Sequence, residues 1–203
     1  MKVKICGITR CEDARAALEL GADLIGLNFY QPSPRYVSLE RAREVRAALG
    51  ARIPLVGVFV NAARACVEKH RAELGLALLQ FHGDESEEEL GGWPVPVIRA
   101  IRLRTASFLL DAQRALGFAD YLLLDAFEPG LFGGTGRRLD LAALARLDLG
   151  RVFIAGGLDP DNVAQVRALQ PYGVDVAGGV ESRPGIKDHQ KLRRFIAHAK
   201  GLP

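Results

Sequence analysis

Short hydrophobic runs alternate with longer amphipathic segments along the whole 203-residue chain. The hydrophobic runs are rich in Val, Ile, Leu and Phe and end at Gly, Asn or Asp, which is typical of buried β-strands. The predicted strands are Lys2–Cys6, Asp23–Asn28, Pro54–Val60, Leu76–His82, Val95–Ile101, Tyr121–Asp125, Val152–Ala155 and Val174–Ala177. The segments between them have helical periodicity, and the predicted helices are Glu12–Leu20, Leu39–Leu49, Ala62–Leu74, Glu85–Leu90, Thr105–Leu116, Leu139–Leu147, Pro160–Leu169 and Asp188–Ala199.

This alternation predicts an α/β fold built on a parallel sheet. Eight strands are the number that closes a barrel, so we expect a single (β/α)8 TIM barrel. Residues 1–203 are predicted to form one domain, because no Pro/Ser-rich linker, composition shift or low-complexity tract divides the chain. The alternative is an open doubly wound sheet, which favours a Gly-x-Gly-x-x-Gly turn after the first strand; the stretch Cys6-Gly7-Ile8-Thr9-Arg10 does not supply one.

Several predicted helices carry a recognisable start. Ser38 precedes one helix and Asn61 another, and both residue types favour the N-cap position. Pro160, directly after Asp159, is expected at the first helical position. The acidic run that begins at Glu85 is expected at the start of a helix, where the positive end of the dipole favours it.

Composition narrows the class of protein. The chain is 49% hydrophobic and 25% charged, an ordinary globular balance. Its longest apolar runs are far shorter than the roughly 18 residues that cross a bilayer, so no membrane segment is expected. Polar residues come too early for a secretory leader, which indicates a cytoplasmic protein. Cys6, Cys11 and Cys66 lack metal-ligand spacing and are odd in number, so we expect free thiols, with no disulfide framework and no metal site.

The charge pattern indicates small anions as ligands. The formal net charge is +3, and most of the 27 cationic residues are arginines. Arginine binds planar anions such as carboxylates and phosphates well. The arginines are scattered among 24 acidic residues and form no basic stripe, so nucleic acid is not an expected partner.

Paired glycines follow the last two predicted strands. Gly156 and Gly157 come after the seventh strand, and Gly178 and Gly179 come after the eighth. Glycine lets backbone N–H groups approach an anion closely, and in (β/α)8 barrels these two loops commonly hold a phosphate. We therefore expect a small-molecule substrate that carries a phosphate.

Candidate chemistry lies at the predicted carboxyl ends of two strands. Lys4 and Cys6 project from the same face of the first strand, and the ammonium is expected to favour the thiolate, which makes Cys6 a base or nucleophile. Asp125 ends an apolar sixth strand, where desolvation is expected to raise its pKa so that it holds a proton near neutrality. An acid and a base on opposite sides of a substrate suit an isomerisation. The alternatives are an inert buried cysteine and an aspartate that caps the next loop.

Other candidates lie in neighbouring loops. Arg35 follows the second strand in Pro32-Ser33-Pro34-Arg35-Tyr36, where two prolines favour a rigid loop, and a carboxylate ligand bound by two hydrogen bonds suits its guanidinium. His82 ends the fourth strand, where a lone histidine has either a structural or a catalytic role. Gly133-Gly134-Thr135-Gly136 is either a mobile lid or an ordinary long turn. Cys11 and Cys66 fall in helical segments and are expected to be packing residues.

Taken together, these segments resemble the phosphoribosylanthranilate isomerase family of tryptophan biosynthesis. The most specific matches are Lys4-Ile5-Cys6-Gly7-Ile8-Thr9 and Ser33-Pro34-Arg35-Tyr36. The other matching segments are Val56–Asn61, Gln80–Gly83, Leu124–Asp125, Gly133–Gly136, Ala155–Leu158 and Asp175–Glu181. The resemblance covers nearly the whole chain.

The resemblance implies an Amadori rearrangement of N-(5-phospho-β-D-ribosyl)anthranilate to 1-(2-carboxyphenylamino)-1-deoxy-D-ribulose 5-phosphate, with no metal or organic cofactor. The motifs do not indicate an oligomeric state, and the Arg-rich composition is compatible with a monomer or a homodimer. It places the general base on Cys6 and the general acid on Asp125. Arg35 matches the residue that binds the anthranilate end, Asp175 matches a strand-eight carboxylate near the sugar, and we assign His82 as a further substrate contact. The phosphate cradle falls on Gly156, Gly157, Gly178 and Gly179.

Two departures from the family and three alternatives stay open. Ala177 and Gly178 stand where the family usually has serine, and Arg137-Arg138-Leu139-Asp140-Leu141 replaces a Lys followed by Phe-Asp-Trp. Among phosphosugar barrels, the histidine-pathway aminoaldose isomerase should carry Asp in place of Cys6, and indoleglycerol phosphate synthase should carry a catalytic lysine pair. The alternative from another class is a non-catalytic barrel that binds phosphometabolites or anionic polymers through its arginines.

Overall fold

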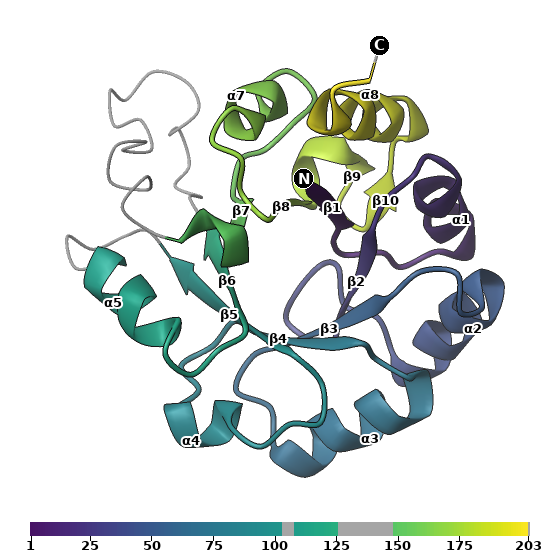
Figure 1. Ribbon diagram of the computed structural model, residues 1–203. Helices are drawn as coiled ribbons and strands as arrows, with labels where there is room; N and C mark the ends of the chain where they lie inside the picture. The colour runs from purple at the N-terminus through teal and green to yellow at the C-terminus, as the bar shows by residue number, and fades with distance from the viewer. Residues whose placement is uncertain (103–107, 126–147, 203) are drawn as a thin grey trace.

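The structure is a computed structural model that describes residues 1–102, 108–125 and 148–202. In these residues eight parallel strands form a closed barrel in chain order, and β8 pairs with β1 to complete it (Figure 1). The strands are β1 Lys2–Ile5, β2 Leu24–Asn28, β3 Leu55–Phe59, β4 Leu78–Phe81, β5 Val97–Arg102, β6 Tyr121–Asp125, β7 Val152–Ala155 and β8 Gly173–Val176. The predicted (β/α)8 barrel is confirmed, with strand ends that differ from the predicted ones by at most two residues.

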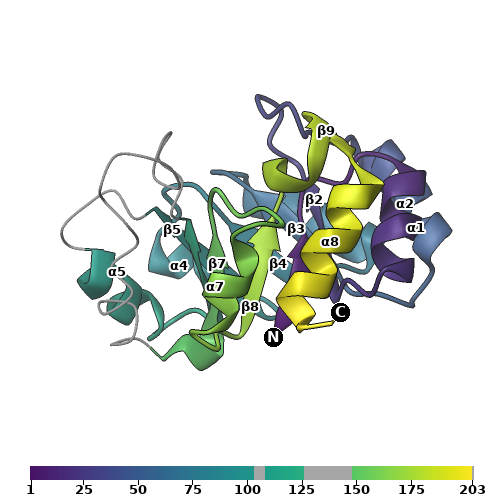
Figure 2. The same ribbon diagram turned by 90° about the horizontal axis from the view of Figure 1, so that it is seen from above.

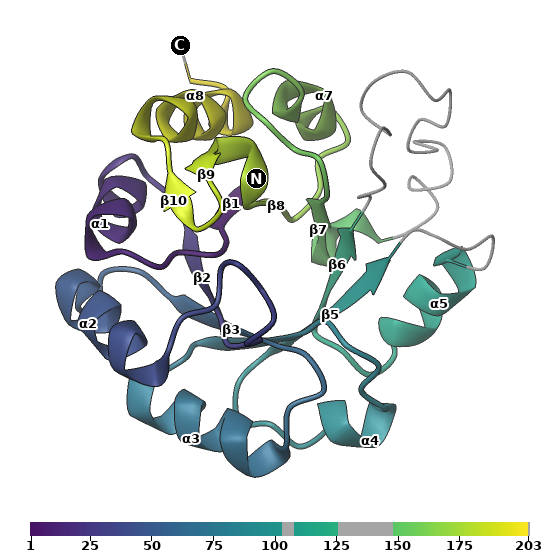
Figure 3. The same ribbon diagram turned by 180° about the vertical axis from the view of Figure 1, so that it is seen from behind.

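The helices pack around the outside of the barrel, and α8 lies beside α1, so that the two ends of the chain close the ring (Figures 1 and 3). They are α1 Cys11–Glu19, α2 Leu39–Leu49, α3 Arg64–Leu74, α4 Glu87–Leu90, α5 Phe108–Ala115, α7 Val163–Arg167 and α8 His189–Lys200. The predicted helix Leu139–Leu147 and the loop Gly133–Gly136 lie outside the described residues. Among the helices that the structure describes, none has the length and apolar character needed to span a bilayer.

A short antiparallel hairpin follows β8, and the hydrophobic pattern does not predict it. The turn η2 Gly178–Val180 leads into β9 Glu181–Arg183 (Figure 2), which pairs with β10 Ile186–Lys187 (Figure 3). Both strands are too short to produce a two-residue period in the sequence. The hairpin brings two charged residues, Glu181 and Lys187, into buried positions.

Alternate residues of each strand face the barrel interior, because side chains on a strand point to opposite faces. One buried apolar cluster is built from every second strand residue: Leu24, Val56, Ile98, Ala100, Leu123, Phe153 and Ala155. The residues between them pack with the helices in a second, larger cluster that includes Ile25, Leu55 and Leu122. This period of two also directs the side chains at the carboxyl ends of the strands into one common space.

Two of the predicted helix starts are wrong. Ser38 does cap α2, and its Oγ accepts a hydrogen bond from Arg41 N at 3.2 Å. Asn61 instead adopts a positive φ of 49°, and α3 begins three residues later without a side-chain cap. Pro160 belongs to a turn before α7, in which Asp159 Oδ1 accepts hydrogen bonds from the backbone N–H groups of Asp161 and Asn162.

The acidic run divides into a buried residue and a helix start. Glu85 is buried, and its carboxylate accepts hydrogen bonds from Arg99 Nη1 at 2.8 Å and from the backbone of Asn61 and Gly83. It precedes α4, whose N-cap is Ser86. The prediction of a helix start is confirmed for Glu87, Glu88 and Glu89, which lie in the first turn of α4. It is wrong for Glu85, whose carboxylate joins the loops after β3 and β4.

Candidate active site

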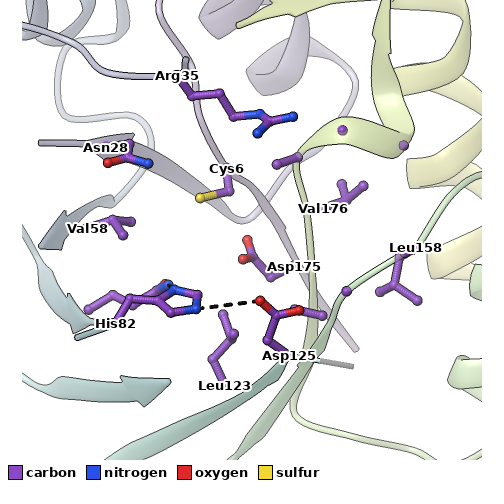
Figure 4. Close-up of a pocket in the computed structure, with 17 residues that line it drawn as sticks. Cys6, Asn28, Arg35, Val58, His82, Leu123, Asp125, Leu158, Asp175 and Val176 are labelled. Carbon is purple, nitrogen blue, oxygen red and sulfur yellow. Dashed lines mark hydrogen bonds and ion pairs between the residues drawn. The ribbon is translucent and has the colours of Figure 1, made fainter. Parts of the chain in front are cut away.

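A cavity of about 430 Å³ opens at the carboxyl ends of the barrel strands (Figure 4). Every candidate residue chosen from the sequence lines it: Cys6, Arg35, His82, Asp125, Gly156, Gly157, Asp175, Gly178 and Gly179. Sequence reasoning missed Asn28, Val58 and Leu123, which also line the cavity. Their inward-facing positions, at even spacing along β2, β3 and β6, are the signal that identifies them.

The Cys6 thiol follows β1 and points into the cavity (Figure 4). Gly26 on the neighbouring strand β2 makes room for it. A Cβ atom at position 26 would lie 2.9 Å from Cys6 Sγ and 3.2 Å from Lys4 Nζ. Position 26 therefore requires glycine, because the side chains of Cys6 and Lys4 leave no room for a Cβ atom.

Lys4 and Asp175 form a buried ion pair next to this thiol. Lys4 Nζ donates to Asp175 Oδ1 at 2.9 Å, and the two side chains are only 0% and 9% exposed. The barrel register sets the pair, because Lys4 of β1 lies opposite Asp175 of β8. Burial opposes the ammonium, but the charges of Asp175 and Cys6 outweigh it and raise the pKa of Lys4.

The pKa of the Cys6 thiol is raised from its ordinary value. Burial is the main cause, the Asp175 carboxylate adds to it, and together they outweigh the opposing charges of Lys4 and Lys187. Lys4 does favour the thiolate, as expected, but its effect is outweighed, so the expectation of a lowered Cys6 pKa is wrong. The physical reasons are first the burial of the thiol and then the Asp175 carboxylate, neither of which the sequence spacing alone reveals.

Asp125 and His82 lie next to each other in the wall of the cavity. Asp125 Oδ2 lies 3.5 Å from His82 Nε2, and the Asp125 side chain is 25% exposed (Figure 4). On the other side of the ring, His82 Nδ1 lies 3.4 Å from Gln80 Nε2. Gln80 is buried, and its Oε1 has no hydrogen-bond partner within the part of the chain that the structure describes. A ligand that brings an N–H or O–H group to this wall would satisfy that acceptor.

Arg35 is held by a carboxylate as well as by its proline-containing loop. Its Nε donates to Glu181 Oε1 at 2.8 Å and its Nη2 donates to Glu181 Oε2 at 2.7 Å. Burial alone would raise the pKa of Glu181, but hydrogen bonds from Arg35 and the charge of Lys187 outweigh it and lower that pKa. Glu181 occupies one edge of the guanidinium, so Nη1 and the second N–H of Nη2 are the donors that a ligand can reach.

The two glycine pairs bring the loops after β7 and β8 together at the cavity. Gly156 and Gly157 have positive φ values of 85° and 65°, the region that favours glycine. Gly179 lies so close to Leu158 that a Cβ atom would collide with the Leu158 carbonyl oxygen. A Cβ atom on Gly178 would lie 3.2 Å from Arg35 Nη2, so the guanidinium occupies the space next to the position where the family usually carries serine.

The remaining cysteines lie outside this cavity. Cys11 is partly buried and packs against the core, as expected. Cys66 is exposed on α3, with its Sγ 3.7 Å from His70 Nδ1, so its assignment as a packing residue is wrong.

Comparison with known proteins identifies the family. A sequence model of the family described as N-(5'phosphoribosyl)anthranilate (PRA) isomerase matches residues 3–198. A relative of this name from Acidithiobacillus ferrooxidans is 47% identical over 203 residues, which cover 99% of this chain and 98% of the relative. Another from Cellvibrio japonicus is 45% identical over 200 residues, which cover 98% of this chain and 93% of the relative.

Solved structures agree with this result over the full length. The crystal structure of phosphoribosyl anthranilate isomerase from Thermotoga maritima has a TM-score of 0.89 and 36% identity, with 100% of both chains covered. A phosphoribosyl anthranilate isomerase in complex with reduced 1-(o-carboxyphenylamino)-1-deoxyribulose 5-phosphate has a TM-score of 0.86 and 35% identity, again with 100% of both chains covered. The family match over residues 3–198 and the full-length relatives show that this chain belongs to the N-(5'-phosphoribosyl)anthranilate isomerase family.

Proposed function

We propose that this chain catalyses the Amadori rearrangement of N-(5-phospho-β-D-ribosyl)anthranilate to 1-(2-carboxyphenylamino)-1-deoxy-D-ribulose 5-phosphate, a step of tryptophan biosynthesis. The observation that carries the proposal is one cavity lined by a thiol, Cys6, and a carboxyl group, Asp125, at the ends of β1 and β6. Strands β7 and β8 separate these two groups in the barrel, so they reach a bound substrate from different directions.

In the proposed mechanism Asp125 is the general acid and Cys6 is the general base. Asp125 gives its proton to the furanose ring oxygen, the C1′–O bond breaks, and the nitrogen lone pair forms an imine at C1′. Cys6, as thiolate, then removes the C2′ proton to give an enolamine, which tautomerises to the ketone at C2′. The atoms of substrate and product are the same, so the reaction needs only proton transfers, which is work that a positioned acid and base can do.

The other lining residues are proposed to bind the two anionic ends of the substrate and its sugar. Gly156, Gly157, Gly178 and Gly179 are proposed to hold the phosphate through backbone N–H groups, since close approach is what these positions favour. Arg35 is proposed to bind the anthranilate carboxylate with the N–H groups that Glu181 does not use. His82 and Asp175 are proposed to contact the sugar, where their side chains accept or donate hydrogen bonds to hydroxyl groups.

We also propose the setting in which this chain works. Its partner is the phosphorylated small molecule and no nucleic acid or membrane, it needs no metal or organic cofactor, and residues 1–203 form a single barrel domain in the cytoplasm. It is a monomer or a homodimer. The Thermotoga maritima relative is described as dimeric, with monomers generated from it.

The test is a direct turnover assay. The purified protein is mixed with freshly made phosphoribosylanthranilate, and the loss of anthranilate-type fluorescence is followed while the ketose product is identified by chromatography. We expect consumption far above the spontaneous rate. A non-catalytic barrel would leave the spontaneous rate unchanged and show only salt-dependent binding. The Cys66→Ser variant, which lacks an exposed thiol outside the cavity, should keep full activity.

A further inference from the structure

We propose that Lys187 is a positioning residue that fixes the backbone of Cys6 to the loop that begins at Ala177. The Lys187 side chain is 0% exposed, and its Nζ donates three hydrogen bonds: to Cys6 O at 2.7 Å, to Ala177 O at 3.1 Å and to Glu181 Oε1 at 2.9 Å. This role rests on the proposed function of Cys6 as base.

The position of these contacts in the barrel gives them their meaning. Strands β1 and β8 pair up to the hydrogen bond from Cys6 N to Val176 O at 2.8 Å. Beyond it the two chain segments separate, one toward the loop after β1 and the other toward the Gly178–Gly179 loop. At this point the ammonium of Lys187 bridges the carbonyl groups of Cys6 and Ala177. It therefore continues the contact between the two segments beyond the last hydrogen bond of the β1–β8 pair.

A buried ammonium is costly, and burial lowers the pKa of Lys187 even though the charge of Glu181 opposes this effect. Lys187 uses all three N–H donors of its ammonium group. Glu181 supplies the opposite charge, and the backbone N–H of Lys187 donates to Asp13 Oδ2 of α1 at 3.1 Å. Desolvating such an ion is unfavourable, so an apolar side chain would serve stability better if packing were its only task.

The bridge matters for the reaction because of what it connects. The phosphate, held by the glycine loop, fixes one end of the substrate, and Cys6 must meet the C2′ hydrogen a few atoms away. The separation between the glycine loop and the Cys6 backbone therefore sets the distance of proton transfer. A displacement of about 1 Å costs on the order of 100-fold in rate.

The experiment compares Lys187→Met with Lys191→Met. Lys191 holds the same hairpin from α8, with Nζ donating to Glu181 O at 3.0 Å, and it is not among the described residues that line the cavity. For Lys187→Met we expect kcat to fall by about 10- to 100-fold with a smaller change in KM, whereas Lys191→Met should keep both. Thermal unfolding verifies that both variants are folded.

A second readout separates a direct effect of Lys187 on the thiol from a general loss of stability. The charged groups that act on Cys6 are Lys4 of β1, Asp175 of β8, Lys187 of β10 and Arg35 of the loop after β2. Removing the Lys187 charge should shift the pH midpoint of Cys6 alkylation upward, measured in a Cys11→Ser and Cys66→Ser background. A variant that is merely less stable would not move this midpoint.

A kcat of folded Lys187→Met equal to that of the wild type would overturn the proposal, whatever the alkylation midpoint. If Lys187→Met does not fold, Glu181→Gln decides, because it removes the carboxylate that accepts a hydrogen bond from Lys187 Nζ; kcat should again fall, and an unchanged kcat contradicts the proposal. Wild-type turnover is measured first. Its absence would refute the proposed function, whereas turnover that Lys187→Met retains would refute only the positioning role.

Discussion

Lys4 Nζ and Asp175 Oδ1 lie 2.9 Å apart inside the barrel, and neither side chain has more than 9% of its surface exposed. The interior of such a barrel is ordinarily filled with branched apolar side chains. A charge pair in this layer gives no advantage in stability over apolar residues of the same volume. Its place beside the Cys6 thiol is consistent with a role in the site, where it contributes both a positive and a negative charge to the surroundings of the proposed base.

Removing one member of this pair should be far more costly than removing an exposed lysine. Lys4→Met leaves the buried Asp175 carboxylate without its partner, so we expect the free energy of unfolding to fall by about 3–5 kcal/mol. Lys2→Met is the matched control on the same strand, since Lys2 is 53% exposed in its ion pair with Asp23; we expect a loss below about 1 kcal/mol. Urea denaturation at pH 7 measures both. Similar losses for the two variants would contradict the account of the buried pair.

Gly26→Ala should damage the site through Cys6. The added Cβ would lie 2.9 Å from Cys6 Sγ and 3.1 Å from Cys6 Cα, so the thiol must shift. We expect a loss of about 1–3 kcal/mol in the free energy of unfolding, as for other overpacked cores, and a fall in kcat of at least tenfold, on the order expected for a misplaced catalytic group. Steady-state kinetics of the folded variant, at a temperature well below its unfolding transition, would show the fall in kcat. Unchanged kcat would mean that the Cys6 position is not critical.

The raised pKa of Cys6 predicts the direction of its reactivity with pH. A thiol whose pKa is raised holds its proton to higher pH, so less thiolate is present at neutral pH than for an ordinary cysteine. In a Cys11→Ser and Cys66→Ser background, alkylation of Cys6 by iodoacetamide should be slow at pH 7 and rise through a midpoint above about 8.5, the ordinary value. A midpoint below that value would show that Lys4 and Lys187 outweigh burial and Asp175.

Gly179→Ala should weaken phosphate binding. The Cβ atom would collide with the Leu158 carbonyl oxygen and force apart the two loops that the phosphate is proposed to join. We expect KM for the substrate and the inhibition constant of inorganic phosphate to rise by about tenfold, the effect of losing a charge-assisted hydrogen bond of roughly 1.5 kcal/mol. Gly91→Ala is the control, because a Cβ atom there meets neighbours only at 3.5 Å or beyond. Equal phosphate inhibition in both variants would argue against this cradle.

The barrel and the residues that line its cavity are predictable from the sequence because both depend on the two-residue period of the strands. Strands of a closed parallel barrel bring their carboxyl ends together, so Cys6, Asp125, Asp175 and the glycine pairs reach one space once the strands are located. Residue types that favour a helix N-cap are less informative. Ser38 caps its helix as expected, whereas the Asn61 side chain accepts a hydrogen bond from Asp84 N at 2.7 Å in place of capping α3.

The charges around the thiol could not be predicted in this way. Lys4 suggests a lowered Cys6 pKa only while the burial of the thiol and the partner of Lys4 are unknown, and Asp175 becomes that partner through the register of β1 against β8. Glu181 and Lys187 lie in strands of three and two residues, whose sequence carries no period. Their contacts with Arg35 and Cys6 span 146 and 181 residues of sequence, so only the folded chain reveals them.

The central claim is that Cys6 and Asp125 are the base and the acid of one reaction, and a turnover measurement of Cys6→Ser and Asp125→Asn tests it most directly. Each is compared with wild type and with Cys66→Ser under saturating phosphoribosylanthranilate, after circular dichroism has verified the fold. We predict that kcat falls by about 10²- to 10⁴-fold in both site variants, the usual contribution of a positioned acid or base, and stays at the wild-type value in Cys66→Ser. Near-full turnover by folded Cys6→Ser or Asp125→Asn would contradict the assigned roles.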